Sequence, residues 1–439
     1  HPAMLRILAD HVDLLDEQLT GQLRDGLAAL PDGDRIVQTW QAMARIPLDA
    51  RRSRLVRWLD GEIRIGGGTG EHLERRTVIA AHSILSRMAP LTADVIQDWA
   101  ELMTDRARLR QVFDIHAPAE FSDGDIDTIH DWCTRAWTRI VEFMDAEKEK
   151  ADEEAFSRGE EGEDDGDEAP GEIEACLDRE DDAMLLRLYQ LKRGWLQDGD
   201  RRIEYDHLMV DEVQDFSALE VRVLLEVVGP GRPVTLAGDT AQKIVREGGF
   251  DDWDTFLDDL GVLDARVESL KIAYRSTVEV MAAAREVLGP LAGDESVATR
   301  HGAPVEVHQF SDPGQAVDFL GGALRDLASR EPLANVAIIA RHASQATLYY
   351  QGLKKAEIPR LSLVVEQDFS FRPGVEVTEV RQVKGLEFDY VVLVECNEDS
   401  YPLNDEARHL LHVGMTRAAH QLWLVTTGRP SPLIPASLL

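Results

Sequence analysis

The chain has few cysteines and no long hydrophobic run, and each shortage excludes a class of protein. Only Cys133, Cys176 and Cys396 occur among 439 residues. They lie far apart without metal-ligand spacing, which argues against a disulfide framework and predicts a reducing, cytoplasmic setting. No apolar run approaches the roughly 18–20 residues that span a membrane. Because the first residues also lack the pattern of a secretory signal, no membrane partner is expected.

Basic residues are also scarce relative to acidic ones. The chain has 47 Lys and Arg against 81 Asp and Glu, a formal net charge of −34. That is the wrong sign for a protein that binds nucleic acid over its whole surface. Residues 145–182 alone hold 19 acidic and 4 basic side chains. Either DNA is met in one restricted groove, or the main partner is a basic protein surface.

Apolar spacing divides the chain into a helical part and an α/β part. Residues 1–144 are predicted to be a helical accessory domain, because apolar residues from Leu8 to Leu27 recur every three or four residues. Residues 145–182 are predicted to be a disordered acidic linker. From residue 203, short apolar runs alternate with helical stretches, which indicates parallel α/β sheets over residues 183–268 and 269–439.

The individual elements follow from the same periodicities. Besides the helix at 8–27, helices are predicted at 36–45, 54–59, 77–88, 92–104, after Ser122, and at 182–195, 314–329 and 343–355. Strands are predicted at 207–210, 233–237, 305–309, 335–340, 361–365, 375–380, 390–395 and 421–426.

One pair of adjacent carboxylates has the pattern of a nucleotide site. The apolar strand at 207–210 ends in Asp211 and Glu212, and Gln214 and Asp215 follow. An NTPase places such a pair beside the β- and γ-phosphates, where the first carboxylate holds Mg²⁺ and the second deprotonates the attacking water. Taken alone, an Asp-Glu pair is more often a solvated surface pair, and the Gln-Asp that follows strengthens the catalytic interpretation.

A second stretch ends another strand in a similar way. Gly-Asp-Thr-Ala-Gln at 238–242 follows the strand at 233–237. One interpretation is a strand-ending turn and a helix cap. The other is that Gln242 senses the γ-phosphate at the carboxyl edge of the sheet, where open α/β sheets bind their ligands.

These two stretches resemble motifs II and III of UvrD/Rep-type superfamily 1 helicases, and three more motifs follow in the family's order. Residues 270–277 (Leu-Lys-Ile-Ala-Tyr-Arg-Ser-Thr) resemble motif IV, residues 383–388 (Val-Lys-Gly-Leu-Glu-Phe) motif V, and residues 413–418 (Val-Gly-Met-Thr-Arg-Ala) motif VI. The resemblance implies RecA-like domains of the P-loop NTPase type, with ATP and Mg²⁺ bound in the cleft between two of them.

The resemblance also implies a role for each matching residue. It assigns Mg²⁺ binding to Asp211, general base catalysis to Glu212, coupling of the γ-phosphate to DNA movement to Gln242, adenine stacking to Tyr274, arginine-finger roles to Arg275 and Arg417, and contacts with the nucleotide to Gly385 and Glu387.

Two departures from the family pattern limit what the resemblance implies. The sequence contains no G-x-x-x-x-G-K-[ST] phosphate loop, and its glycine-rich stretch at 66–70 lacks the lysine. The expectation is therefore a fragment of a longer protein, inactive as an ATPase by itself because the phosphates lose their main cradle. In addition, Arg381 and Gln382 replace the family's His-Ser-type pair, which puts DNA translocation in question.

The spacing of the motifs distinguishes branches of the family. Lys384 follows Arg275 by only 109 positions, too few for the large helical insertion of processive UvrD/Rep enzymes. This layout resembles the HelD-type branch, helicase-like ATPases that bind bacterial RNA polymerase and release it from nucleic acid. The acidic segment 145–182 would either enter the polymerase's positive channel or act only as a solvated linker.

Two alternatives stay open beside this leading hypothesis. One is a DNA-translocating UvrD/Rep-type helicase of repair or replication. It would need a basic groove with interleaved aromatics. The other is a non-catalytic scaffold that retains the motor fold. The intact residues Asp211, Glu212, Gln242, Arg275 and Arg417 argue against such decay.

Overall fold

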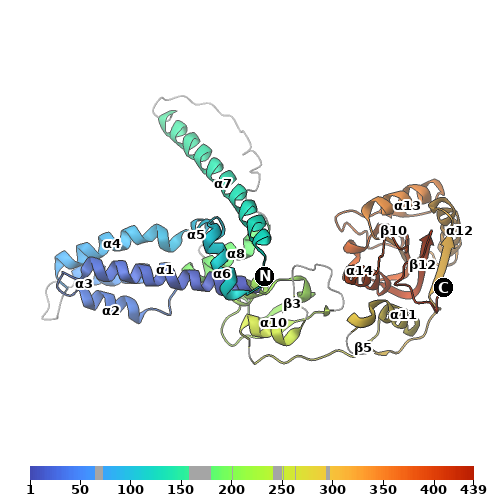
Figure 1. Cartoon of the computed structure of the whole chain (residues 1–439), viewed down its shortest axis with the longest axis horizontal. Helices are drawn as coiled ribbons and strands as arrows, with labels where there is room; N and C mark the ends of the chain where they lie inside the picture. Colours follow the sequence, from blue (N-terminus) through green and yellow to red (C-terminus); the bar gives the residue numbers. More distant parts are fainter. Residues whose placement is uncertain are drawn as a thin grey trace. The chain divides into compact units, whose positions relative to one another are not determined.

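The computed structural model describes residues 1–64, 73–157, 179–199, 201–240, 250, 252–262, 264–292 and 297–439, without the side chains of 147–157 and 179–180. These residues form two compact units (Figure 1). The first comprises His1–Met209, Phe216–Thr235 and Asp258–Gly261. The second comprises Val210–Asp215, Leu236–Leu257 and Val262–Leu439. Among the described helices, none combines the length and the apolar character that crossing a membrane requires.

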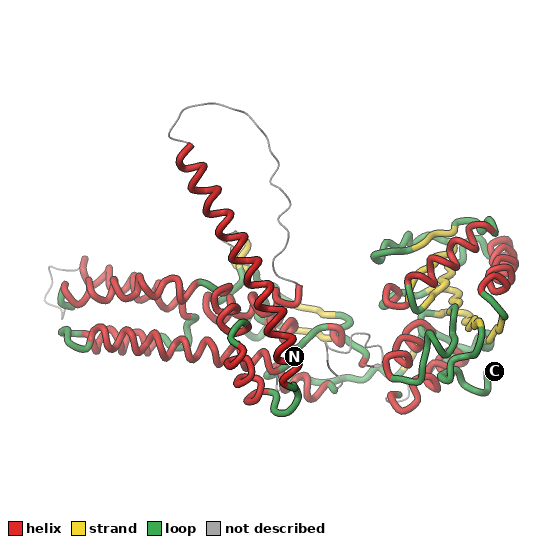
Figure 2. Tube along the Cα trace, turned by 45° about the horizontal axis from the view of Figure 1, so that its top comes forward, coloured by secondary structure: helices red, strands yellow, loops and turns green. Residues whose placement is uncertain are grey.

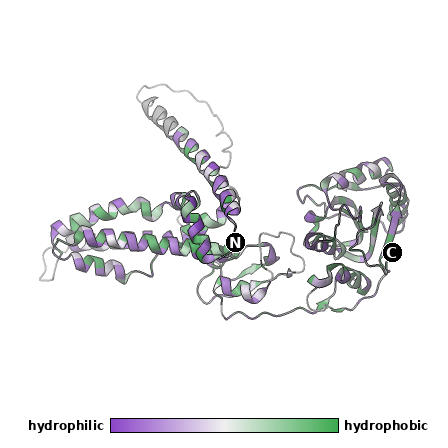
Figure 3. Cartoon of the chain, viewed as in Figure 1, coloured by the Kyte–Doolittle hydropathy of each residue, from purple (hydrophilic) through white to green (hydrophobic). Residues whose placement is uncertain are grey.

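The first unit is built from helices, which confirms the helical character predicted for the N-terminal region. Its helices are α1 (Ala3–Leu27), α2 (Gly33–Ala42), α3 (Leu48–Arg64), α4 (Arg75–Ala93), α5 (Val95–Met103), α6 (Arg106–His116), α7 (Asp123–Ser157), α8 (Arg179–Arg193) and α9 (Ala218–Leu225). The helices α6 and α9 were not predicted. Hydrophobic and hydrophilic residues alternate along α1 and α4, as expected for helices with one buried face (Figure 3).

The leucine stripe of α1 is the centre of this helical core. Leu19, Leu23 and Leu27 are fully buried against residues of the other helices. Burying one such side chain contributes about 1.5–3 kcal/mol. The helix stops before Asp32, whose φ of 60° turns the chain sharply into α2.

A buried ionic network joins three helices of this unit and was not predicted. Lys192 of α8 is fully buried, and its ammonium group contacts Asp98 of α5 and donates to the carbonyl oxygen of Asp94 at 2.7 Å. His11 of α1 also reaches Asp98, with 3.1 Å between Nε2 and Oδ1. Because an unpaired buried charge is costly, this network favours one register of α1, α5 and α8.

The acidic segment differs from the prediction at both of its ends. Helix α7 continues to Ser157 and α8 begins at Arg179, so residues 145–157 and 179–182 are helical where a disordered linker was predicted. The prediction considered only that the segment could not bury apolar surface. Residues 145–151 consist of Asp, Ala, Glu and Lys, and Ala, Glu and Lys have high helix propensity without burial. The rest of the predicted linker, 158–178, lies outside the described residues.

Several short strands precede the main sheet. They are β1 (Gln197–Asp198), β2 (Arg201–Arg202), β3 (Leu208–Val210), β4 (Val234–Leu236), β5 (Ile272–Ala273) and β6 (Val297–Ala298). They pair as β1–β2, β3–β4 and β5–β6. Strands β3 and β4 were predicted, and helix α10 (Trp253–Leu260) follows them in the chain.

A six-stranded parallel sheet is the centre of the second unit. Its strands lie in the order β7-β12-β11-β8-β10-β9, and every pairing is parallel. Their bounds are β7 (Glu306–Phe310), β8 (Asn335–Ala340), β9 (Leu361–Leu363), β10 (Gly374–Glu379), β11 (Phe388–Leu393) and β12 (Ala418–Thr427). All six were predicted, and the parallel α/β fold class is confirmed.

Helices cover both faces of this sheet, as a parallel sheet requires. Their bounds are α11 (Val278–Leu288), α12 (Pro313–Arg330), α13 (Ala343–Lys355) and α14 (Asp405–Met415). Along β8, Ile338 packs in one core with residues of α12 and α13, while Ile339 packs in the other with residues of α11 and α14. The strands therefore lie between helices (Figure 2), and loops at the strand ends carry the motif residues.

Candidate nucleotide site

Motifs II and III follow the paired strands β3 and β4. The backbone N–H of Ala237 donates to the carbonyl oxygen of Val210 at 2.8 Å, and the N–H of Val213 donates to that of Ala237 at 2.9 Å. These bonds hold the two loops beside each other. Asp211 is exposed, and Glu212 has a φ of 52°. Such a left-handed backbone is uncommon for a residue other than glycine and is frequent at functional sites.

The buried side chain of Gln214 connects the two motifs. Its Nε2 donates to Glu212 Oε2 at 2.6 Å, and its Oε1 accepts the backbone N–H of Asp239 at 2.9 Å. Gly238 permits this approach, because a Cβ there would lie 2.6 Å from Gln214 Oε1. Gln214 therefore orients the proposed general base against the turn after β4. The sequence singled out Gln214 as part of a motif but did not predict this contact.

Motif V reaches the same carboxylates through Lys384. Its Nζ lies 2.6 Å from Asp215 Oδ1 and 3.7 Å from Glu212 Oε2, and the side chain is only 9% exposed. The next residue, Gly385, has a φ of 77°, and a Cβ there would lie 3.9 Å from Glu212 Oε1. Sequence reasoning gave Lys384 no role. Its position inside the Lys-Gly-Leu-Glu core of motif V could have identified Lys384 as a candidate site residue.

Motif IV and the end of motif V meet in an ion pair. The Nε of Arg275 lies 2.7 Å from Glu387 Oε2, and both side chains are partly exposed. An exposed pair of this kind contributes at most about 1 kcal/mol, so a nucleotide could redirect both groups at little cost. The neighbouring Tyr274 is 75% exposed, which leaves its ring accessible for stacking.

Arg417 of motif VI is fully buried on the turn between α14 and β12. Its guanidinium donates to the carbonyl oxygens of Val413 at 3.0 Å and Leu386 at 3.1 Å. Burial, together with the nearby positive charge of Arg275, lowers the pKa of Arg417 to about 10, while the negative charge of Glu212 opposes the shift. The group therefore stays protonated at neutral pH. The two carbonyl oxygens orient the guanidinium group, which is buried away from water.

Two predicted features of the site cannot be placed. Gln242 and the glycine-rich stretch 66–70 lie outside the described residues. The departure from the family pattern at Arg381 and Gln382 can be placed. Arg381 pairs with Glu406 at 2.9 Å, and Gln382 Oε1 accepts the backbone N–H of Gln367 at 2.9 Å.

The carboxylates fit a Mg²⁺ ion that a nucleotide brings with it. Within the described ranges, no group of three or more His, Cys, Asp or Glu side chains is arranged to hold a metal ion. Mg²⁺ usually binds through one or two carboxylates together with substrate phosphates and water. The exposed Asp211 at the end of β3 matches that requirement.

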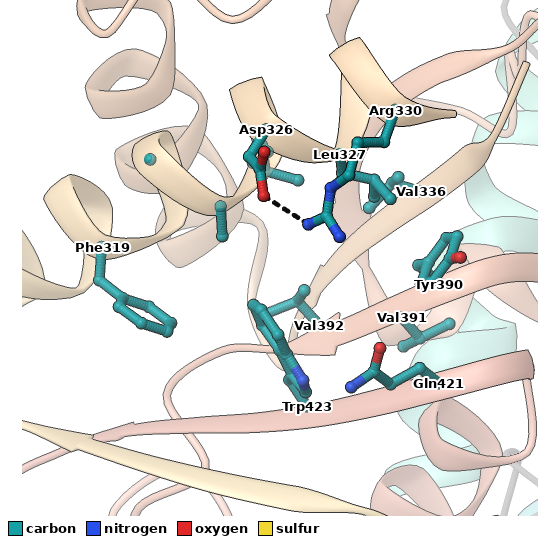
Figure 4. A pocket seen from close by; sticks show the side chains of 13 residues that line it. Phe319, Asp326, Leu327, Arg330, Val336, Tyr390, Val391, Val392, Gln421 and Trp423 are labelled. Atoms are coloured by element: carbon teal, nitrogen blue, oxygen red, sulfur yellow. Dashed lines mark hydrogen bonds and ion pairs between the residues drawn. The ribbon is translucent and has the colours of Figure 1, made fainter. Parts of the chain in front are cut away.

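The unit also contains an apolar cavity that is separate from these motifs. It has a volume of about 530 Å³ and lies between α12 and the strands β8, β11 and β12. Phe319, Trp423 and Tyr390 line it, and the ion pair of Asp326 with Arg330 lies at its side (Figure 4). None of the motif residues that the structure describes is among its lining residues, so the cavity is separate from the described part of the predicted nucleotide site.

The fold and the motif geometry define an α/β protein of the RecA-like type with a carboxylate and arginine site at its loops. Residues 374–425, which run from β10 into β12, match the UvrD-like helicase C-terminal domain. This match covers part of the second unit, and the relatives below are likewise similar to part of the chain.

Two relatives illustrate the similarity. The ATP-dependent DNA helicase UvrD2 of Mycobacterium tuberculosis (strain ATCC 25618 / H37Rv) is 33% identical over 164 residues, 35% of this chain and 23% of the relative. DNA helicase II of Haemophilus influenzae is 25% identical over 186 residues, 40% of this chain and 25% of the relative. The chain thus spans about a quarter of the length of the curated relatives it matches.

Solved structures are also similar in part. The C-terminal domain of a possible DNA helicase from Lactobacillus plantarum is 27% identical and covers 38% of this chain and 96% of that chain, with a TM-score of 0.33. The PRRSV helicase is 18% identical and covers 50% of this chain and 34% of that chain, with a TM-score of 0.27.

Proposed function

We propose that this chain supplies the carboxylate loops and the second RecA-like domain of an ATP-hydrolysing nucleic-acid motor. The observation that carries the proposal is the contact of Lys384 in motif V with Asp215 and Glu212 in motif II. It brings the loop that holds Glu387 next to the pair that would bind Mg²⁺ and activate water. Hydrolysis then requires a phosphate loop, which the 439 residues do not contain.

Each motif residue has a role in this proposal. Asp211 binds Mg²⁺ and Glu212 deprotonates the attacking water. Arg275 and Arg417 stabilise the charge that develops on the γ-phosphate. The remaining contacts are adenine stacking by Tyr274, nucleotide contacts by Gly385 and Glu387, and coupling by Gln242.

Two partners are candidates for this motor, DNA and RNA polymerase, and different observations favour each. DNA is supported by the printed names of the relatives, an ATP-dependent DNA helicase and a DNA helicase II. RNA polymerase, as in the HelD-type branch, is supported by the net charge of −34 and by the short spacing from Arg275 to Lys384. A basic polymerase surface would attract such a charge.

ATP turnover distinguishes the two candidates. The assay uses the full-length protein, with any segment that precedes His1, and titrates single-stranded DNA and core RNA polymerase separately. Stimulation by DNA alone supports a translocating DNA helicase and argues against the polymerase-associated type. A weak response to DNA, with tight binding to polymerase or a changed rate on its addition, supports the polymerase-associated type. No turnover under any condition would contradict the motor proposal and leave a non-catalytic scaffold.

A further inference from the structure

The apolar cavity of the second unit is large enough to receive side chains of another molecule. Its volume of about 530 Å³ lies within the range of about 300–1,000 Å³ that ligand pockets commonly have. Phe319 of α12 and Trp423 of β12 line it with their ring centroids 5.7 Å apart, and Tyr390 of β11 lines it as well (Figure 4). Walls of this kind favour apolar groups over water.

Carboxylates gather around this cavity. Asp326 belongs to its lining and forms an ion pair with Arg330. Their side chains are 62% and 69% exposed, so the pair is weak and can rearrange when another molecule binds. Glu331 is exposed too, and it accepts a hydrogen bond from the hydroxyl group of Tyr390 at 2.8 Å. A cation that approaches the end of α12 therefore meets two carboxylates.

The other charges near the cavity do not offset this acidity. Glu306 of β7 accepts a hydrogen bond from Gln421, another lining residue, at 3.2 Å, and its second oxygen lies 3.4 Å from Nε2 of His308. Arg325 of α12 donates instead to the carbonyl oxygen of Ala356 at 2.7 Å. Among the described side chains that line the cavity or hydrogen-bond to a lining side chain, three carboxylates thus face one guanidinium group.

These charges distinguish between the molecules that could occupy the cavity. The phosphates of a nucleic acid or of an anionic lipid would meet the carboxylates and be repelled. A second copy of the chain would bring its own net charge of −34. A basic protein segment has the complementary charge, and it can also carry apolar side chains that fit the cavity walls.

We propose that the cavity is a docking site for a basic segment of a partner protein. The segment inserts one or two apolar side chains between α12 and the strands β11 and β12, where they act as anchors in an apolar pocket. Lysine or arginine side chains beside the anchors then reach Asp326 and Glu331. The volume supports more than one anchor, because it exceeds that of a single leucine or phenylalanine side chain.

The docking site is independent of the proposed nucleotide chemistry, because the cavity shares no described residue with the motifs. It also contains its own reporter of binding. The indole nitrogen of Trp423 is buried and has no hydrogen-bond partner among the described residues, although a buried indole N–H usually has one. A group that enters the cavity changes the surroundings of this indole ring.

The test follows the indole N–H resonance of Trp423 in the whole chain by NMR, with the resonance assigned by its loss in Trp423→Phe. Physiological ionic strength screens nonspecific attraction to the acidic protein. The probe is a synthetic lysine-rich peptide that contains a pair of leucines, and it should shift the resonance in a saturable way. The same peptide with alanines in place of the leucines, or with glutamates in place of the lysines, should not.

Two variants of the chain separate the apolar part of the proposal from the charged part. Ala323→Trp fills the cavity from α12 and should weaken binding of the labelled peptide, measured by fluorescence anisotropy, at least about tenfold. The double change Asp326→Lys with Glu331→Lys reverses the charge around the cavity. It should also weaken binding about tenfold, and this loss should shrink as salt is added.

Matched controls repeat both kinds of change elsewhere in the second unit. Ala282→Trp adds an exposed ring to α11, and Glu286→Lys with Asp399→Lys reverses two exposed charges outside the cavity lining. Both controls should bind the peptide nearly as the wild type does. Unchanged thermal melting of the variants shows that the fold is intact.

Each remaining outcome overturns the proposal. Equal binding of the leucine and alanine peptides, or undiminished binding by Ala323→Trp, would show a charge contact outside the cavity. A single-stranded oligonucleotide that shifts the Trp423 resonance, or a dimer that Ala323→Trp abolishes, would assign the cavity to nucleic acid or to a second copy. A wild-type chain that does not bind the peptide would also contradict the proposal, while ATP turnover by the full-length protein would still decide the proposed function separately.

Discussion

The ammonium group of Lys384 lies 2.6 Å from the carboxylate of Asp215, although 169 positions separate the two residues. This ion pair joins motif V to motif II within the second unit. Lys384 also lies 3.7 Å from Glu212, so one cation serves two carboxylates. The φ of 77° at the next residue, Gly385, is a conformation that glycine adopts without strain.

The contribution of this pair can be measured by a double-mutant cycle with Lys384→Met and Asp215→Asn. Since Lys384 is largely buried, the coupling free energy should be roughly 1–2 kcal/mol. The measurement is hydrogen exchange of the β8 and β11 amides, which reports the second unit. The exposed pair of Arg330 and Asp326 is the control and should give less than about 0.5 kcal/mol. Equal coupling in both cycles would contradict a special role for Lys384.

The close packing at Gly238 predicts opposite effects for two glycine substitutions. In Gly238→Ala the new Cβ would meet Gln214 Oε1 at 2.6 Å and Val213 Cγ1 at 2.9 Å, so stability should fall by about 1–3 kcal/mol. In Gly322→Ala, on helix α12, nothing lies within 4 Å. That variant should gain about 0.5–1 kcal/mol from helix propensity. Urea unfolding of both variants tests this, and a neutral Gly238→Ala would refute the contact.

His412 predicts a pH dependence of stability. Burial lowers the pKa of His412 to about 4 from its ordinary value of 6.5. The unfolded chain therefore binds the proton more readily, and this group's stabilisation is complete above about pH 6.5 and falls as pH drops toward 4. The loss amounts to roughly 3 kcal/mol.

The variant His412→Gln should remove this part of the pH dependence of the free energy of unfolding between pH 4 and 7. The measurement is again hydrogen exchange of the β8 and β11 amides. The half-exposed His420 is the control, and His420→Gln should leave most of the slope. A wild-type slope that persists in His412→Gln would show that other groups cause it.

The buried Lys192 predicts a large loss of stability in the helical unit. Lys192→Met leaves the carboxylate of Asp98 buried without its cation, which should cost about 3–5 kcal/mol. Adding Asp98→Asn should recover part of the loss, because the charge is then gone. Arg6→Met, which breaks an exposed pair of 3.8 Å with Asp259, should cost less than about 1 kcal/mol. The losses are measured by hydrogen exchange of the α1 and α5 amides. Similar losses for Lys192→Met and Arg6→Met would contradict the stabilising role of the buried Lys192 pair.

The regular elements could be predicted where periodicity and length agreed. Strand β8 (Asn335–Ala340) and helix α13 (Ala343–Lys355) have the predicted bounds. Helix α9 was missed, although its signal was readable. Ser217 and Glu220 form a capping box at its start. The long helix α7 was cut short because acidic composition was given more weight than helix propensity.

The site could be predicted only as a set of residues. Local patterns identified Asp211, Glu212, Arg275 and Arg417, since each lies in a motif. Their contacts depend on how distant loops fold together, which a single sequence does not contain. The bridge through Gln214, the burial of Arg417 and the ion pair of Arg275 with Glu387 are therefore structural findings.

The most direct test of the account is ATP turnover by the full-length protein compared with its Glu212→Gln variant. The amide keeps the size of the side chain and removes the base, so turnover should fall by about a hundredfold or more while nucleotide binding remains. Asp114→Asn, a change at an exposed acid of α6, is the control and should turn over like the wild type. Undiminished turnover by Glu212→Gln would contradict the role of Glu212 as the general base and with it the central claim.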